Sequence, residues 1–112
     1  GRVVDLDGLT NQLEGGAIQA LSWCLKEAVH FDEDGVTSVD WDTYPIIRFS
    51  EIPEVTTVVI DHPKERSLGA GEATLGPTAG ALGNAVYAAC GVRVRDLPMT
   101  SQQLRKSAAV SL

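Results

Sequence analysis

The chain has 112 residues, enough for one domain or part of one, and 44 % of them are hydrophobic and 21 % charged. This composition excludes a disordered or low-complexity chain, and no apolar run approaches the roughly 20 residues that a membrane-spanning helix needs. A formal net charge of −6 argues against nucleic acid or an anionic membrane surface as the main partner, because both select basic proteins. The first residue is Gly1 rather than Met, so we expect a processed product or a segment of a longer polypeptide.

The first predicted element is an amphipathic helix over residues 12–29, in which apolar side chains recur at helical spacing. Asn11 and Glu14 predict a capping box at its start, with Glu14 as a cap rather than an acid. Gly15 and Gly16 lie inside this helix, where each costs about 1 kcal/mol relative to alanine. The pair therefore predicts that another segment or a ligand approaches the helix backbone closely.

The middle of the chain is predicted to be extended. Residues 28–39 predict a β-hairpin, because an Asp-Gly pair supplies its turn. Residues 40–54 contain two prolines and no clear period, which indicates an ordered loop. Residues 55–60 are β-branched throughout, which predicts a further strand.

The last part of the chain predicts a glycine-rich loop followed by two helices. Residues 77–89 form the first helix, with a proline in its first turn and Gly91 as its C′ residue. Residues 92–95 alternate valine and arginine, typical of a short strand or an extended exit. Thr100 is placed to cap a short helix over residues 101–109. Together the elements predict an α+β fold, with a long helix, a hairpin, an additional strand and a glycine-loop helix in one domain.

The two cysteines and two histidines do not predict a metal site. Cys24 and Cys90 lie far apart and outside any CxxC or Cys/His cluster, which argues against zinc and against a dense disulfide framework. We expect both as small apolar side chains on helices. His30 and His62 are isolated, and we expect them on the surface.

The loop GAGEATLGPT, residues 69–78, has the most unusual pattern in the chain. It leads into a helix start, where free backbone N–H groups favour anions. The pattern GxxxxGK(S/T) of a nucleotide-binding P-loop fails, because Pro77 stands where lysine is needed. The dinucleotide pattern GxGxxG fails as well, because Thr74 replaces its third glycine.

Glu72 is the carboxylate that these glycines flank. Glycines let a backbone approach a ligand closely, and they leave a neighbouring side chain sterically open. Local sequence leaves two roles for Glu72. It is either a surface residue that complements a nearby helix N-terminus or a general base in a cofactor pocket.

Four stretches resemble one protein family when taken in this order: GRVVDLDGLTNQLEGGAIQALSW, WDTYPIIRFSEIPEV, LGAGEATLGPTAGALGNAV and VRVRDLPMT. They resemble the C-terminal end of the molybdenum-binding subunit of the xanthine oxidase family, and most of all its bacterial isoquinoline 1-oxidoreductase and aldehyde-dehydrogenase-like branch. The resemblance covers nearly the whole chain but only the last portion of a family subunit. It implies that residues 1–112 are the C-terminal part of a molybdopterin-binding domain.

The resemblance implies roles for five residues. Glu72 matches the catalytic glutamate of the family, the general base that takes the proton from a molybdenum-bound hydroxyl. Gln12 matches a glutamine that lies close to the molybdopterin. Gly69, Ala70 and Gly71 would bring the backbone up to the metal group.

Two further residues of this loop, Thr74 and Gly76, are weaker candidates for the same site. The implied enzyme is a molybdenum hydroxylase that oxidises an aldehyde or an N-heterocycle. Its implied cofactors are molybdenum–molybdopterin, in the cytosine dinucleotide form, and iron–sulfur clusters on a partner subunit or domain.

The implied partners are the rest of the molybdenum-binding subunit, a 2Fe–2S subunit and a small-molecule substrate, without nucleic acid or an integral membrane segment. The compartment stays open between bacterial cytoplasm and periplasm. By itself the chain is expected to be inactive, because a base without its metal performs no hydroxylation. The alternative is a non-catalytic structural or assembly module that retains the family fold. Molybdenum in the parent protein would discriminate between the two.

Overall fold

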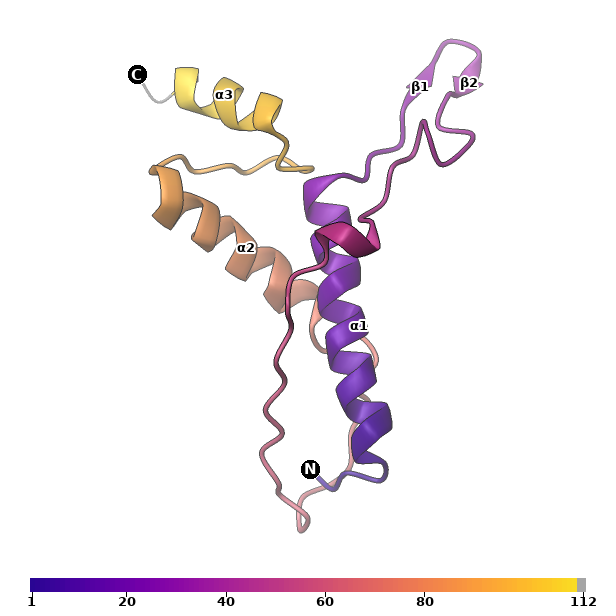
Figure 1. Ribbon diagram of the computed structural model, residues 1–112, viewed down its shortest axis with the longest axis vertical. Coiled ribbons are helices and arrows are strands. Elements are labelled where there is room, and N and C mark those ends of the chain that lie inside the picture. The colour runs from indigo at the N-terminus through magenta and orange to yellow at the C-terminus, as the bar shows by residue number, and fades with distance from the viewer. Residues whose placement is uncertain (111–112) are drawn as a thin grey trace.

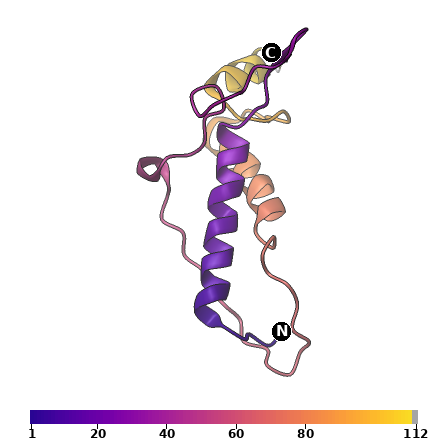
Figure 2. The same ribbon diagram turned by 90° about the vertical axis from the view of Figure 1, so that its right-hand side faces the viewer.

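The computed structural model describes residues 1–110 as three α-helices, one small hairpin and long irregular connections (Figure 1). Helix α1, Leu6–Leu25, runs along the long axis of the molecule. Helix α2, Leu75–Cys90, starts beside the middle of α1 and diverges from it, and α3, Ser101–Val110, lies beyond the far end of α2 (Figures 1 and 2). No helix in the described part of the chain has the length and apolar character to cross a membrane.

Helix α1 begins earlier and ends earlier than the predicted range of 12–29. Its N-cap is Asp5, whose carboxylate accepts a hydrogen bond of 3.2 Å from the amide of Gly8. The predicted capping box of Asn11 and Glu14 is wrong, because both residues lie inside the helix. An acidic cap ahead of the first apolar repeat therefore defines the start.

A hairpin forms within residues 28–39, as predicted, but its strands are shorter than predicted and its turn is formed by Glu33 and Asp34. Strand β1, Phe31–Asp32, pairs antiparallel with β2, Gly35–Val36, and Phe31 lies opposite Val36. Gly35, the first residue after the turn, has φ +135°, a conformation that favours glycine. The hairpin projects from the end of α1 that lies opposite the chain's N-terminus (Figure 1).

The predicted strand over residues 55–60 is wrong. The segment runs beside α1, but β1 and β2 are the only paired strands among residues 1–110. Its side chains still alternate as in a strand, half-buried at odd positions and exposed at even positions. The β-branched sequence extends the backbone, but a strand also needs a pairing partner. Residues 92–95 also form no strand. They are an irregular connection, so the second of the two predicted alternatives, an extended exit from the helix, is the one that occurs.

The buried core is small and lies where α1 meets the connection between α2 and α3. Ala20 and Cys24 contribute to it from α1, and Val94 and Met99 from the connection. The amide of Met99 donates a 2.6 Å hydrogen bond to the carbonyl of Cys24, which joins the two parts. Burial raises the pKa of the Cys24 thiol, as expected for a small apolar residue, whereas Cys90 is exposed at the end of α2.

The boundaries of α2 and α3 agree closely with prediction. Gly91 ends α2 in the left-handed conformation, with φ +71°, and its amide donates to the carbonyl of Tyr87. The Thr100 hydroxyl accepts a 3.2 Å hydrogen bond from the amide of Gln103, so the predicted cap of α3 is confirmed. Helix α2 begins at Leu75, so the following proline stands in its first turn.

Candidate functional site

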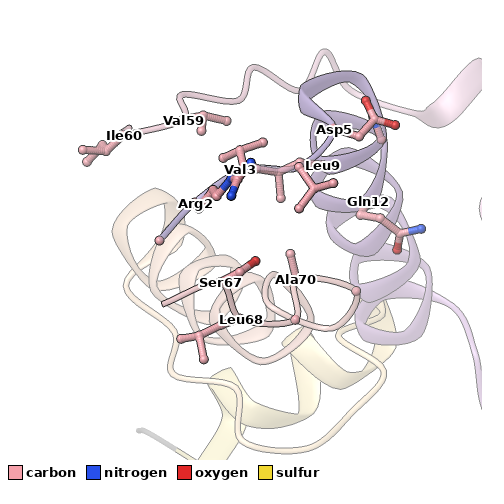
Figure 3. Close-up of a pocket in the computed structure, with 15 residues that line it drawn as sticks. Arg2, Val3, Asp5, Leu9, Gln12, Val59, Ile60, Ser67, Leu68 and Ala70 are labelled. Carbon is pink, nitrogen blue, oxygen red and sulfur yellow. The ribbon is translucent and has the colours of Figure 1, made fainter. Parts of the chain in front are cut away.

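A cleft of about 440 Å³ lies between the first turns of α1, the N-terminal segment and the loop that precedes α2 (Figure 3). Figure 3 places Leu9 and Gln12 on α1 and Ser67, Leu68 and Ala70 on the facing loop. The cleft is mainly apolar, with Arg2 and Asp5 as its charged side chains. Its lining residues are Gly1, Arg2, Val3, Val4, Asp5, Gly8, Leu9, Gln12, Val59, Ile60, Ser67, Leu68, Gly69, Ala70 and Gly71.

Four of the five residues singled out from the sequence line this one cleft. Gln12 comes from α1, and Gly69, Ala70 and Gly71 come from the loop. Glu72 does not line it, although it follows Gly71 directly; its side chain is exposed in the turn before α2. The cofactor role of the four and the catalytic role of Glu72 stay predictions.

The loop backbone has room on its cleft side. A Cβ atom added to Gly69 meets no atom within 4 Å, and one added to Gly71 lies 3.6 Å from Oε1 of Gln12, an ordinary contact. Neither glycine has a positive φ. Within residues 1–110, neither a steric contact nor a positive φ requires glycine at position 69, and its backbone lines the cleft without a side chain.

Two long-range hydrogen bonds hold the cleft together. The amide of Arg2 donates to the carbonyl of Glu65 at 3.2 Å, which ties the N-terminal segment to the facing loop. The hydroxyl of Thr74 donates to the carbonyl of Leu13 at 3.0 Å, which ties the end of the loop to α1. These two bonds therefore fix the loop, as one wall of the cleft, against the N-terminal segment and α1, which form the other.

Two residues, Asp5 and Thr74, contribute more to the site than the sequence indicates. Asp5 lines the cleft and also caps α1, and the spacing Asp-x-x-Gly was the available signal. Thr74 is one of the weaker candidates from sequence, yet its side chain makes the hydrogen bond between the loop and α1. Among residues 1–110, no three His, Cys, Asp or Glu side chains gather as a metal site would require.

A second and more apolar cleft, of about 610 Å³, lies along the C-terminal part of α1. Trp23, Trp41, Tyr44 and Phe49 line it. The Trp41 side chain is 73 % exposed and that of Phe49 is 95 % exposed, so much aromatic surface faces outward. Patches of this kind on soluble proteins mark contact surfaces.

The fold recurs in an enzyme subunit of known structure. The chain superimposes on part of quinoline 2-oxidoreductase from Pseudomonas putida 86 with a TM-score of 0.71 and 22 % identity, over 88 % of this chain and 14 % of that one. This match shows the fold of a segment of a much longer chain. No family model matches the sequence.

Three curated proteins match at higher identity. A nicotinate dehydrogenase subunit from Pseudomonas putida is 38 % identical over 105 residues, which are 94 % of this chain. A membrane-bound aldehyde dehydrogenase (pyrroloquinoline-quinone) from Gluconacetobacter polyoxogenes is 33 % identical, and the beta subunit of isoquinoline 1-oxidoreductase from Brevundimonas diminuta is 30 % identical, each over 88 % of this chain. The matched region spans only 9 %, 13 % and 12 % of these three relatives.

The chain is thus homologous to a segment of oxidoreductase subunits in the xanthine oxidase family. The resemblance inferred from its motifs is confirmed. The structural match also confirms the predicted α+β fold of this segment, and the relatives that it resembles are oxidoreductases.

Proposed function

We propose that this chain is the C-terminal part of the large subunit of a molybdenum hydroxylase, and that it supplies the general base, Glu72. One observation carries the proposal. Gln12 and the Gly69–Gly71 backbone, which the family resemblance assigns to the cofactor, line the same cleft although they are far apart in sequence. Glu72 follows this backbone directly and is held in the turn at the cleft's edge.

The residues of the cleft fit a polar organic cofactor. The Gln12 carboxamide offers both a donor and an acceptor, and the amides of Gly69, Ala70 and Gly71 donate to no acceptor within residues 1–110. Consecutive free amides on accessible backbone suit the phosphate and carbonyl oxygens of a molybdopterin. Apolar walls from Leu9 and Leu68 would shield its ring system from water.

The molybdenum group, when bound, supplies the redox chemistry. Glu72 accepts a proton at its carboxylate, the task of a general base. A carboxylate performs this task best when it is partly removed from water, because desolvation raises its pKa toward neutrality. Glu72 is exposed in this chain. The desolvating surface therefore comes from the rest of the subunit, and the chain alone is inactive.

The finer assignments follow from the same proposal. The substrate is an aldehyde or an N-heterocycle, since the relatives' names include nicotinate, isoquinoline and aldehyde enzymes. The cofactor is the cytosine dinucleotide form of molybdopterin, and electrons leave through iron–sulfur clusters on a 2Fe–2S partner.

The test compares Glu72→Gln with wild type in the full-length subunit, expressed with its iron–sulfur partner. The control is Glu33→Gln, which removes an exposed carboxylate in the turn between β1 and β2, far from the cleft. Metal and cofactor content are measured first, and turnover of an aldehyde and of an N-heterocycle follows. We expect molybdenum in all three proteins, near-normal turnover for the control, and a loss of about 100-fold or more for Glu72→Gln.

Three results would contradict the proposal. Near-normal turnover of Glu72→Gln with normal molybdenum would remove Glu72 as the base. Wild-type protein without molybdenum or turnover would favour the assembly module. Pyrroloquinoline quinone in place of molybdenum would favour the chemistry that one relative's name states.

A further inference from the structure

We infer that Thr74 is a positioning residue, whose hydrogen bond to α1 determines where Glu72 lies relative to Gln12. Gly16 leaves the space beside α1 that the Thr74 side chain occupies. This inference rests on the proposed function above, but its geometry is independent of it. The Thr74 hydroxyl donates a 3.0 Å hydrogen bond to the carbonyl of Leu13, the residue after Gln12. This single hydrogen bond thus joins the segment that contains Glu72, the predicted base, to the helix turn that contains Gln12, the predicted cofactor residue.

The bond is not an ordinary helix cap. Thr74 is the N-cap residue of α2, where threonine commonly accepts a hydrogen bond from its own helix. No such capping bond is present here, because the hydroxyl is directed to α1 instead. The carbonyl of Leu13 lies within a helix and also faces its own helical donor. The threonine side chain therefore serves the contact between α1 and the loop.

Gly16 makes this approach possible. It is buried, and a Cβ atom added to it would overlap Oγ1 of Thr74 and lie 3.7 Å from the carbonyl oxygen of Gly71. Its neighbour Gly15 is exposed, and among residues 1–110 no atom lies within 4 Å of a Cβ added to it. The close approach predicted for the glycine pair therefore occurs at Gly16 alone.

The turn between the loop and α2 transmits the constraint to Glu72. The amide of Ala73 donates to the carbonyl of Ala70 at 3.3 Å, and the amide of Leu75 donates to the carbonyl of Glu72 at 3.2 Å. These bonds fix the backbone on both sides of Glu72. With Thr74 anchored to α1, the backbone of Glu72 is held at a defined place beside the helix, and its carboxylate extends from that fixed point. A misplacement of a catalytic group by about 1 Å can cost roughly 100-fold in rate.

The experiment uses the full-length subunit with its iron–sulfur partner and two pairs of variants. Thr74→Val removes the hydroxyl and keeps the shape, whereas Thr74→Ser keeps the hydroxyl. Gly16→Ala forces the loop away from α1, and Gly15→Ala is its matched control with open space around the new methyl. Metal content, kcat, KM and amide hydrogen exchange of residues 69–75 are measured for each.

For Thr74→Val we expect unchanged molybdenum, kcat lowered about 10- to 100-fold, and KM changed much less. Exchange at Ala73 and Leu75, whose amides are hydrogen-bonded in this turn, should rise about tenfold while the later turns of α2 stay protected. Thr74→Ser should recover most of the rate, and Gly16→Ala but not Gly15→Ala should reproduce the loss.

Wild-type kcat and exchange in Thr74→Val would overturn the inference. So would loss of molybdenum in both Thr74 variants, because a purely structural residue would then explain the effect. The parent proposal fails separately: near-normal turnover of Glu72→Gln removes the base, whatever the Thr74 variants do. A defective Glu72→Gln beside an unimpaired Thr74→Val removes only the positioning role.

Discussion

The phenol oxygen of Tyr44 lies 2.7 Å from Oε2 of Glu27, so the loop after the hairpin is tied to the residues just beyond α1. Tyr44 donates this hydrogen bond, which raises its pKa above the ordinary value near 10; desolvation and the negative charge of Glu27 act in the same direction. Because the folded-state pKa is raised, the bond's contribution to stability is present below pH 10 or so and is lost as the pH rises through the raised value.

We predict that Glu27→Gln lowers the pKa of Tyr44, because the charged acceptor is removed. Carbon NMR of tyrosine in the isolated chain measures this, since the chain contains only two tyrosines. Tyr44→Phe assigns the signal by its disappearance. An unchanged titration curve in Glu27→Gln would show that the contact does not form in solution.

The contribution of Glu51 to folding stability should depend on pH in the acidic range. The ammonium of Lys26 donates a hydrogen bond to the Glu51 carboxylate, and the amide of Arg48 adds a second, so the pKa of Glu51 is lowered. A lowered folded-state pKa gives stability that is present above the ordinary pKa and is lost as the pH falls through the folded value.

We therefore predict that Lys26→Met lowers Tm slightly at neutral pH, since exposed ion pairs contribute little. The difference from wild type should shrink as the pH falls below about 4. Thermal unfolding over a pH series, followed by circular dichroism, measures it. A difference that stays constant into acid would assign the effect to the lysine's packing rather than its charge.

The core around Ala20 should reject larger side chains. Ala20 is 1 % exposed and lies on α1 one turn before Cys24, whose carbonyl accepts the hydrogen bond from Met99. Ala20→Leu is predicted to cost about 1–3 kcal/mol, because overpacking forces neighbours out of place. Urea unfolding measures the loss. Ala88→Leu, on an exposed position of α2, is the control and should change stability by less than about 0.5 kcal/mol.

Residues 55–60 should acquire a pairing partner in the complete subunit. Their backbone amides find no acceptor within residues 1–110, and the chain spans about a tenth of its relatives' length. An extended β-branched segment with unpaired amides is a template for strand addition. Hydrogen-exchange mass spectrometry should show fast exchange here in the isolated chain and strong protection in the full subunit. Equally fast exchange in both would mean that no strand pairs with it.

The contrast between α1 and residues 55–60 shows what local sequence can predict. Helical hydrogen bonds are made within the segment, so the apolar repeat around Leu21 and Cys24 was enough to predict α1. Its start was misplaced because Asp5 caps it ahead of that repeat. Strand formation depends on distant partners, and no pattern within residues 55–60 can supply them.

The candidate site follows the same rule. Gly69, Ala70 and Gly71 were found from their pattern and family resemblance, and they do lie with Gln12 in one cleft. The bond from Thr74 to Leu13 joins residues 61 positions apart, so no local motif announces it. Gly16 is a partial signal in the sequence. The free-energy cost of a glycine inside a helix indicates that another segment approaches closely, but it does not identify Thr74 as that segment.

Two hydrogen bonds close the same long loop of the chain. One joins Arg2 to Glu65, and the other joins Thr74 to Leu13. The hairpin and the segment that follows it lie within that long loop, at the other end of α1 from the cleft (Figure 1). Lengthening a loop whose ends are already held adds little entropy cost, because that cost grows only logarithmically. Over evolution, insertions should accumulate at the turn between β1 and β2, whereas residues 2–13 and 65–74 should keep their spacing.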